Sequence, residues 1–354
     1  MKKKMIVLAV AGVFAGAGNA FAAADTSANV SGFADARYMI TDDSADNLIN
    51  GDTNPANNAF AAEGEVDFSM TQGAIGARID LDLSNSPVPG NHSQIEQAFV
   101  SWGLADNVNL LVGQMNNPVG QEKQDIVDRD FVTTNVVFNV LDQQTAQYSN
   151  NVDGVAVAGT AGMVNYAVAV VNDIGRGRDL SGTGNTSVDT FDANSFAFNV
   201  GVMPMEGLNV ALGYISQASY DVATNAGSAG NIVDLNADYL WNELKVGFDY
   251  LSASDILDNA YTVWGTYGFG GQFGVGVRYD SASFDGTAVG ITNPDDVTAT
   301  TFYLAYMPAE SMDIKLEIKD GSADLTGGKV NTTMTGIAGI NDGALNQIAV
   351  TARF

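Results

Sequence analysis

Apolar and polar side chains alternate at every second position over most of this chain, and no long segment keeps apolar residues at helical spacing. Residues 312–319 are the clearest case, with Met, Ile, Leu and Ile at the even positions and Asp, Lys, Glu and Lys at the odd positions. Successive side chains of a strand point to opposite faces, so this segment has one apolar and one charged face. The pattern predicts an all-β fold.

Turn-forming residues divide the chain into sixteen expected strands. They span residues 28–40, 59–71, 74–84, 92–103, 108–115, 143–160, 163–172, 190–203, 208–220, 230–241, 243–253, 259–269, 273–283, 297–307, 311–320 and 343–354. Residues 154–172 carry no charge and are nominally long enough for a transmembrane helix. Their glycines and β-rich runs on either side of Ala161-Gly162 indicate a hairpin instead.

The connections between the expected strands are alternately short and long. Short ones fall at Gln72-Gly73, 104–107, Ala161-Gly162, 204–207, Trp241-Asn242, 270–272 and 308–311. Long ones fall at 41–58, 85–91, 116–142, 173–189, 221–229, 254–258, 284–296 and 321–342. Tight turns on one rim, longer loops on the other and an even strand count are typical of outer-membrane barrels. We therefore expect a 16-stranded antiparallel transmembrane β-barrel with short periplasmic turns and long extracellular loops.

The N-terminus has the features of a secretory signal peptide. Lys2, Lys3 and Lys4 precede the apolar run 5–14, and Ala20-Phe21-Ala22 supplies a small-x-small cleavage site. We expect residues 1–22 to be removed and residues 23–354 to form a single barrel domain. The chain has no cysteine, so its stability outside the cytoplasm cannot come from disulfides.

The expected strands carry apolar residues on one face and charged residues on the other. Charges on this scale are too costly to bury in a dry core, so we expect them to line a water-filled lumen. Twelve acids and seven bases fall on the inward faces of the assigned strands. The lumen acids of the first three strands are Asp35, Glu63, Glu65, Asp67, Asp80 and Asp82.

Two segments resemble known outer-membrane proteins. The chain ends in Phe354, preceded at alternate positions by Ala352, Val350 and Ile348, which resembles the terminal-aromatic signal read by the barrel-assembly machinery. Residues 94–172 are similar to Gram-negative porins allied to the phosphate-selective porins O and P. The matching positions are Gly113, Pro118, Gly120, Glu122, Arg129 and Asp130.

The porin resemblance implies a usually homotrimeric diffusion channel whose third extracellular loop folds inward and narrows the pore. Residues 116–142 occupy that position here. The implied constriction residues are Glu122, Lys123, Asp125, Asp128, Arg129 and Asp130. An ordinary solvated loop is the alternative.

The charge pattern departs from phosphate-selective porins, which line their pores with arginine and lysine. The excess of inward acids predicts a weakly cation-selective channel for small hydrophilic solutes and ions; an anion-selective, phosphate-type channel is the alternative. Arg37 and Arg78 either face the acids of the third loop across the pore or pair with their neighbours Asp35, Asp80 and Asp82.

Other functions are less well supported. The net charge of −26 excludes nucleic acid as a natural partner, because binding phosphates needs clustered bases. The only histidine, His92, adjoins Ser93, and neighbours on a strand point apart, so we expect no enzyme activity. The acidic segment 41–54 lacks the EF-hand spacing, and we expect no metal and no cofactor.

A surface adhesion barrel stays open as an alternative function. We expect lipid and lipopolysaccharide to surround the barrel.

Overall fold

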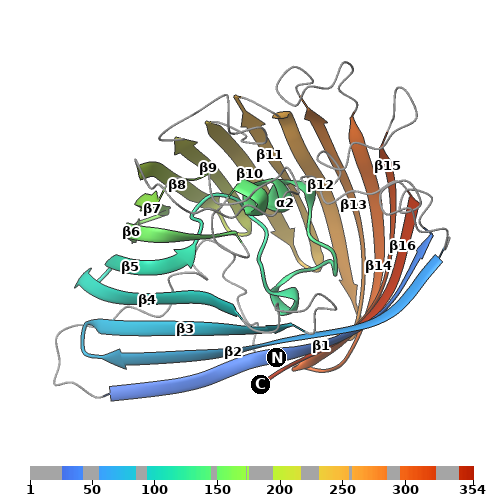
Figure 1. The fold of residues 1–354 in the computed structure, drawn as a ribbon, viewed down its shortest axis with the longest axis horizontal. Helices are drawn as coiled ribbons and strands as arrows, with labels where there is room; N and C mark the ends of the chain where they lie inside the picture. The colour runs from blue at the N-terminus through green and yellow to red at the C-terminus, as the bar shows by residue number, and fades with distance from the viewer. Residues whose placement is uncertain are drawn as a thin grey trace.

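The computed structural model describes residues 26–42, 56–84, 94–144, 150–172, 174, 194–216, 231–254, 257–284, 296–323 and 343–354. These residues form a closed antiparallel barrel of sixteen strands in which each strand pairs with its neighbours in sequence and β1 pairs with β16 (Figure 1). The predicted fold class is confirmed. The predicted signal peptide, His92 and most of the long connections lie outside the described residues.

The strands follow the predicted order. They are β1 Thr26–Asp42, β2 Ala56–Gln72, β3 Ile75–Ser84, β4 Gln94–Ala105, β5 Val108–Asn116, β6 Asn151–Ala161, β7 Val164–Asn172, β8 Asn194–Met205, β9 Leu208–Ser216, β10 Ile232–Trp241, β11 Leu244–Ala253, β12 Leu257–Phe269, β13 Phe273–Phe284, β14 Val297–Ala309, β15 Met312–Ala323 and β16 Gly343–Arg353. The largest difference is at β6, where the prediction began at residue 143. Residues 143 and 144 belong to a helix instead.

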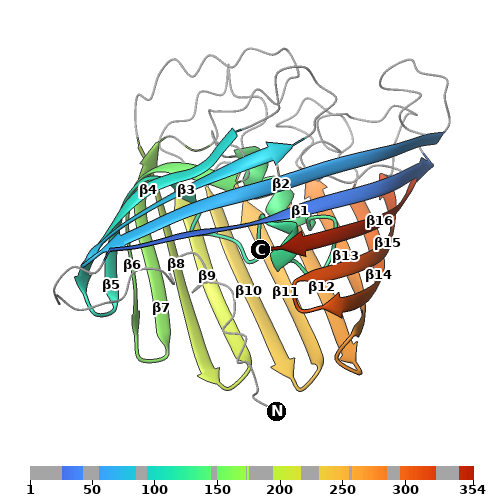
Figure 2. The same cartoon turned by 90° about the horizontal axis from the view of Figure 1, so that it is seen from below.

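Seven short turns lie together on one rim of the barrel (Figure 2). The turn between β2 and β3 contains Gly73 at φ 59°, and the turn between β10 and β11 contains Asn242 at φ 54°, both in the left-handed region that glycine and asparagine tolerate. A carbonyl in each turn accepts one further hydrogen bond, of 2.7–3.0 Å, from an amide of the next hairpin or of β16. These hydrogen bonds link neighbouring hairpins at the rim and continue the ladder of the strands there.

The first and last strands close the barrel through Gly32 and Phe354. The Gly32 amide donates to the Phe354 carbonyl at 3.2 Å, and the Phe354 amide donates to the Gly32 carbonyl at 3.0 Å. A Cβ atom on Gly32 would lie 2.1 Å from the Glu65 carbonyl oxygen and 2.9 Å from Cζ of Phe354. Only glycine lets β1, β2 and the C-terminus approach this closely.

The outer surface is apolar, as the alternation predicts. On β15, Leu316 and Ile318 are exposed, whereas Lys315, Glu317 and Lys319 are buried inside the barrel. Other strands repeat this arrangement. Outward apolar residues that are at least 38% exposed include Phe68, Met70, Ile75, Ile79, Leu83, Val246, Phe248, Tyr250, Phe273, Val275, Val277 and Tyr279. An apolar outer band is the surface that lipid requires.

The interior is not lined by charge throughout, because a packed apolar region lies beside the charged wall that the sequence predicts. A buried apolar cluster joins the inner faces of several strands to the helix α2, Val136–Gln144. The wall contributes mainly small residues there, among them Ala156, Ala158, Ala167, Ala169, Ala260, Ala282 and Ala299. These leave room for Val136, Val137, Val140 and Leu141 of the helix, so this side of the lumen is a packed core.

The alternating pattern does not predict helix α2. Its apolar residues recur at helical spacing over only two turns, which is too short to stand out against the strand pattern. No helix within the described ranges has the length and apolar character needed to cross a membrane.

We predict that Gly32→Ala destabilises the barrel by about 1–3 kcal/mol, because the added methyl group overlaps the Glu65 carbonyl. The temperature at which the folded form disappears on SDS gels measures this loss. Gly265→Ala is the control, since its Cβ would have only ordinary contacts, the nearest at 3.7 Å. If both variants lose the folded form at the same temperature, the backbone of Glu65 does not pack tightly against Gly32.

Candidate pore and its inward-folded loop

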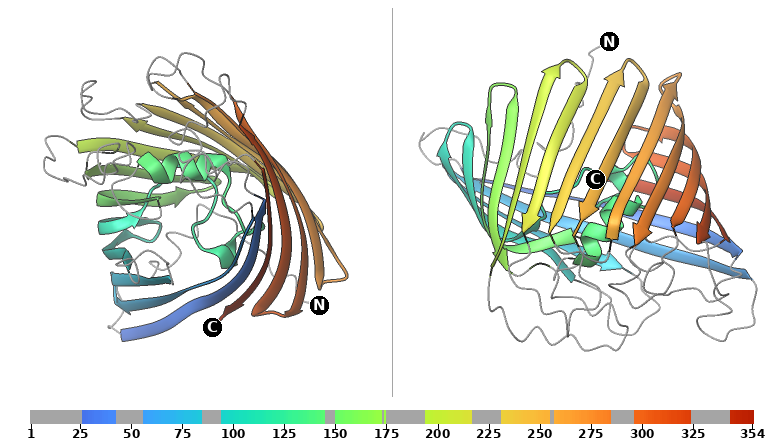
Figure 3. Two further views of the ribbon diagram at one scale, coloured as in Figure 1. Left: turned by 45° about the vertical axis from the view of Figure 1, so that its right-hand side comes forward. Right: turned by 90° about the horizontal axis from the view of Figure 1, so that it is seen from above.

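The described part of the segment between β5 and β6, residues 117–144 and 150, lies inside the barrel rather than above its rim (Figures 1 and 3). Its two ends are joined where it leaves the wall: the Asn117 amide donates to the Asn150 carbonyl at 2.9 Å, and Asn117 Nδ2 donates to Asn150 Oδ1 at 3.1 Å. Between these ends run a short 3₁₀ helix, η1 Ile126–Asp128, and α2. We call this segment the inner loop.

Glu317 on β15 holds the middle of the inner loop. Its carboxylate accepts hydrogen bonds from the backbone amides of Val132 at 2.6 Å and Thr133 at 3.0 Å, and from Gln347 Nε2 at 3.0 Å. Glu317 is fully buried. Hydrogen bonds to a charged acceptor are stronger than neutral ones, so Glu317 attaches the middle of the loop firmly to the wall.

Arg278 on β13 makes the densest set of contacts with the inner loop. Its guanidinium donates to the carbonyls of Thr133 at 2.7 Å and Thr134 at 2.9 Å, while its Nε donates to Asp280 at 2.8 Å. Glu122 lies 3.6 Å from Nη1. The guanidinium is 4.8 Å from the centroid of the Phe131 ring. A buried arginine with this many acceptors keeps its charge.

Further polar contacts attach the inner loop around the barrel. They join Lys245 Nζ to Asp130 at 2.9 Å, Gln121 Nε2 to Asp238 at 2.8 Å, Lys315 Nζ to the Arg129 carbonyl at 2.7 Å, Arg353 to the Val127 carbonyl at 2.7 Å, and Asn199 Nδ2 to the Pro118 carbonyl at 2.9 Å. Five strands contribute these donors and acceptors. The loop is therefore held as part of the barrel interior.

Burial changes the acid–base properties of the inner loop. Burial raises the pKa of Glu122, although Arg278 and Arg129 oppose the rise, and burial lowers the pKa of Arg129. Burial together with the neighbouring acids Asp128 and Asp67 raises the pKa of Asp125 to about 7. Burial lowers the pKa of Lys123, although the neighbouring carboxylates Asp128 and Asp125 oppose this fall.

The predicted residues of the first strands lie on the inner wall, and both arginines pair with neighbouring acids. Arg37 forms ion pairs with Asp35 and Glu63. Arg78 donates from Nε to Asp80 at 2.7 Å and lies 3.8 Å from Asp67. Arg78 also interacts electrostatically with Asp125, whereas the loop residue near Arg37 is another base, Arg129. Asp82, the remaining predicted lumen acid, is half-buried on β3.

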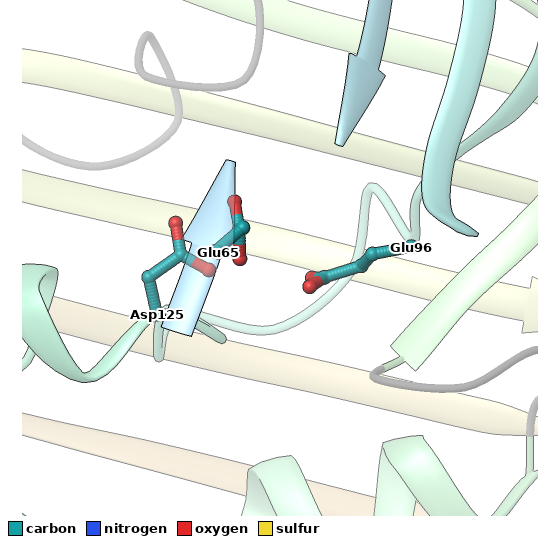
Figure 4. Close-up of side chains that lie close together, drawn as sticks. All are labelled: Glu65, Glu96 and Asp125. Atoms are coloured by element: carbon teal, nitrogen blue, oxygen red, sulfur yellow. The ribbon is translucent and has the colours of Figure 1, made fainter. Parts of the chain in front are cut away.

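The inner loop meets the wall of β2, β3 and β4 at a group of carboxylates (Figure 4). Glu65 on β2, Glu96 on β4 and Asp125 on the loop bring carboxylate oxygens within 4.8 Å of one another. Glu65 also belongs to a second group of the same size with Asp67 and Asp80. The structure thus brings Asp125 of the predicted constriction together with the predicted lumen acid Glu65, which also adjoins Asp67 and Asp80.

Sequence reasoning missed Glu96 because a β-bulge interrupts the alternation. Asp80 pairs with Gln97 and Leu81 pairs with Ile95, so Glu96 has no partner in the ladder. Ile95 is exposed on the outer face, while Glu96 and Gln97 are both buried inside. Bulges re-aim side chains in this way, and simple two-residue alternation cannot detect them.

The four residues of the predicted assembly signal share one face of the C-terminal segment. Ile348 and Phe354 are exposed, at 47% and 68%. Ala352 is exposed and Val350 is half-buried. All four belong to the outward-facing set, and the buried Ala349 and Thr351 between them point inward. Recognition of this face by the assembly machinery stays a prediction.

A closed sixteen-stranded barrel with an apolar exterior, a charged interior and an inward-folded loop defines a transmembrane diffusion channel. The Gram-negative porin family matches residues 7–307, and the chain belongs to this family. The protein is therefore an outer-membrane diffusion channel. Its family consists of channels, not of enzymes.

Solved structures with the same fold cover nearly the whole chain. OmpF of Salmonella typhi, in complex with daunomycin, matches with a TM-score of 0.71 at 12% identity, covering 92% of this chain and 97% of that one. The channel DcaP of Acinetobacter baumannii matches with a TM-score of 0.63 at 16% identity, and the match covers 96% of this chain and 100% of that one. An anion-selective porin of Comamonas acidovorans matches with a TM-score of 0.63 at 14% identity, and the match covers 93% of this chain and 99% of that one. No curated protein matches the chain significantly. At these identities the likeness shows the fold alone.

We predict that Glu317→Ala loosens the inner loop, because two loop amides lose a charged acceptor and each such bond contributes about 1.5–3 kcal/mol. Single-channel recordings should show larger current fluctuations than wild type. Asp313→Ala removes the same charge from the same face of β15, where the Arg353 guanidinium lies 3.9 Å from the Asp313 carboxylate. Identical noise in the two variants would contradict the anchoring role of Glu317.

Proposed function

We propose that this porin is a passive channel for small hydrophilic solutes and ions, narrowed by the inner loop and weakly selective for cations. The constriction is formed by Glu122, Lys123, Asp125, Asp128, Arg129 and Asp130 of the loop, with Arg37 and Arg78 on the wall. The observation that supports this most strongly is the acidic surface where loop and wall meet, made by Glu65, Glu96 and Asp125.

The distribution of bases supports the sign of this selectivity. Arg37 and Arg78 each contact two acids, and Arg278 contacts Asp280 and Glu122. Lys245 pairs with Asp130. Positive charges that are already balanced leave a negative field at the remaining carboxylates, which attracts cations and repels anions.

The selectivity is expected to be modest. Physiological salt screens charges over about 8–10 Å, and ions that stay hydrated in a wide pore feel only part of the field of the wall. The anion-selective Comamonas porin shares the fold, so the arrangement of charges rather than the barrel decides the sign.

The same proposal includes the membrane environment, the export and assembly signals and the oligomeric state of the channel. The outer face is exposed to lipid and lipopolysaccharide, the terminal residues Ile348 to Phe354 serve the assembly machinery, and residues 1–22 act as the cleaved signal. A homotrimer is the expected assembly; OmpT of Vibrio cholerae, of similar fold with a TM-score of 0.57 at 12% identity, is described in a trimer form.

The zero-current potential across a potassium chloride gradient tests the proposal. With EDTA present, wild-type channels should prefer potassium over chloride, and Asp125→Asn combined with Asp128→Asn should reduce that preference, because both carboxylates lie on the inner loop.

The matched control is Asp106→Asn combined with Glu206→Gln, which removes two exposed acids from the short turns. We expect these substitutions to leave the preference almost unchanged, since screening isolates the rim from the constriction. A wild-type preference for chloride would overturn the proposed sign. Equal losses in both double variants would remove the inner loop from the selectivity mechanism.

A further inference from the structure

We propose that Glu65, Glu96 and Asp125 bind one divalent cation, with calcium as the best-matched ion, and that the ion ties the inner loop to the barrel wall. This site deepens the proposed channel function, because it lies at the constriction that the proposal invokes. It also revises the expectation from the sequence that the chain holds no metal.

The geometry of the three carboxylates suits a single ion. Their oxygens lie within 4.8 Å of one another and come from β2, β4 and the inner loop. Calcium takes 6–8 oxygen ligands at 2.3–2.6 Å, so two ligands of one ion are at most about 5 Å apart. Three carboxylates supply up to six oxygens, and waters of the lumen complete the shell.

Glu96 supplies an independent sign that a ligand belongs here. The residue is only 2% exposed, and its Oε1 has no hydrogen-bond partner. Figure 4 shows its carboxylate pointing toward Glu65 and Asp125. Burying a carboxylate oxygen without a partner is costly, and the bulge between Asp80 and Leu81 aims it at two further acids. A cation removes that cost.

The neighbouring bases Arg78 and Lys123 balance this group only in part, through Asp125. The second acidic group, Glu65 with Asp67 and Asp80, already holds the Arg78 guanidinium, which donates to both oxygens of Asp80. Lys123 is shared between Asp128 and Asp125. Glu65, by contrast, interacts with Asp67, Asp125 and Glu96, all acids. Protons are the rival occupants, because a protonated carboxyl can also bridge two neighbours.

A bound cation would change both the motion and the charge of the constriction. Asp125 lies one residue before η1, eight residues along the chain from the joined end at Asn117. An ion shared with Glu65 and Glu96 would fix this part of the loop. Two positive charges would also weaken the negative field, so calcium should reduce the preference for potassium.

Calcium titration of the full refolded barrel in detergent, free of lipopolysaccharide and stripped with EDTA, tests the site. Calorimetry should show one saturable site per chain in wild type. Glu96→Gln should bind calcium at least about tenfold more weakly, since ligand charge sets calcium affinity, and Asp125→Asn gives the same test without altering the wall. Asp313→Asn, an acid outside the group, should bind like wild type.

In planar bilayers, calcium should shift the zero-current potential of wild type but not that of Glu96→Gln. Wild-type channels that conduct in EDTA but bind no calcium in a saturable way would overturn the site and leave the proposed function standing. Glu96→Gln and Asp125→Asn binding like wild type would also overturn it. Absence of conductance with calcium binding intact would overturn the proposed function instead.

Discussion

The structure depends on the closure of its hydrogen-bonded ladder. Lipid offers no partner to backbone amides and carbonyls, so a strand-built protein can cross a membrane only if the last strand pairs with the first. Here β1 pairs with β16, and Gly32 and Phe354 exchange two hydrogen bonds at the seam. The rim of turns adds one bond per hairpin. Closure leaves the side chains free to divide into an apolar outside and a polar inside.

That division places charged residues in an interior that is only partly wet. The inner loop fills one side of the lumen with the apolar face of α2, and small wall residues make room for it. Toward its middle the loop replaces apolar contacts with charged ones, through Glu317, Arg278 and Lys245. Ion pairs between loop and wall balance Lys245 and Arg278, and ion pairs within the wall balance Arg37 and Arg78, so the acids near Asp125 dominate the constriction.

The fold was predictable from the sequence, whereas the constriction was predictable only in outline. Sixteen strands and seven turns follow from local alternation and turn residues, which each strand carries independently. The helix α2 is too short for its period to be recognised, and the bulge at Glu96 breaks the alternation that assigned the other lumen acids. The inner-loop partners of Glu317, Val132 and Thr133, are more than 180 residues away along the chain, and no local pattern encodes such contacts.

The central claim is that the inner loop lines the conducting pore. The chain has no cysteine, so Asp128→Cys gives a single reactive thiol at an exposed position of the loop. The most direct measurement is the single-channel current of this variant before and after reaction with a bulky, positively charged thiol reagent. The account predicts a stepwise fall in current that a reducing agent reverses. Current that stays unchanged after complete labelling would contradict it.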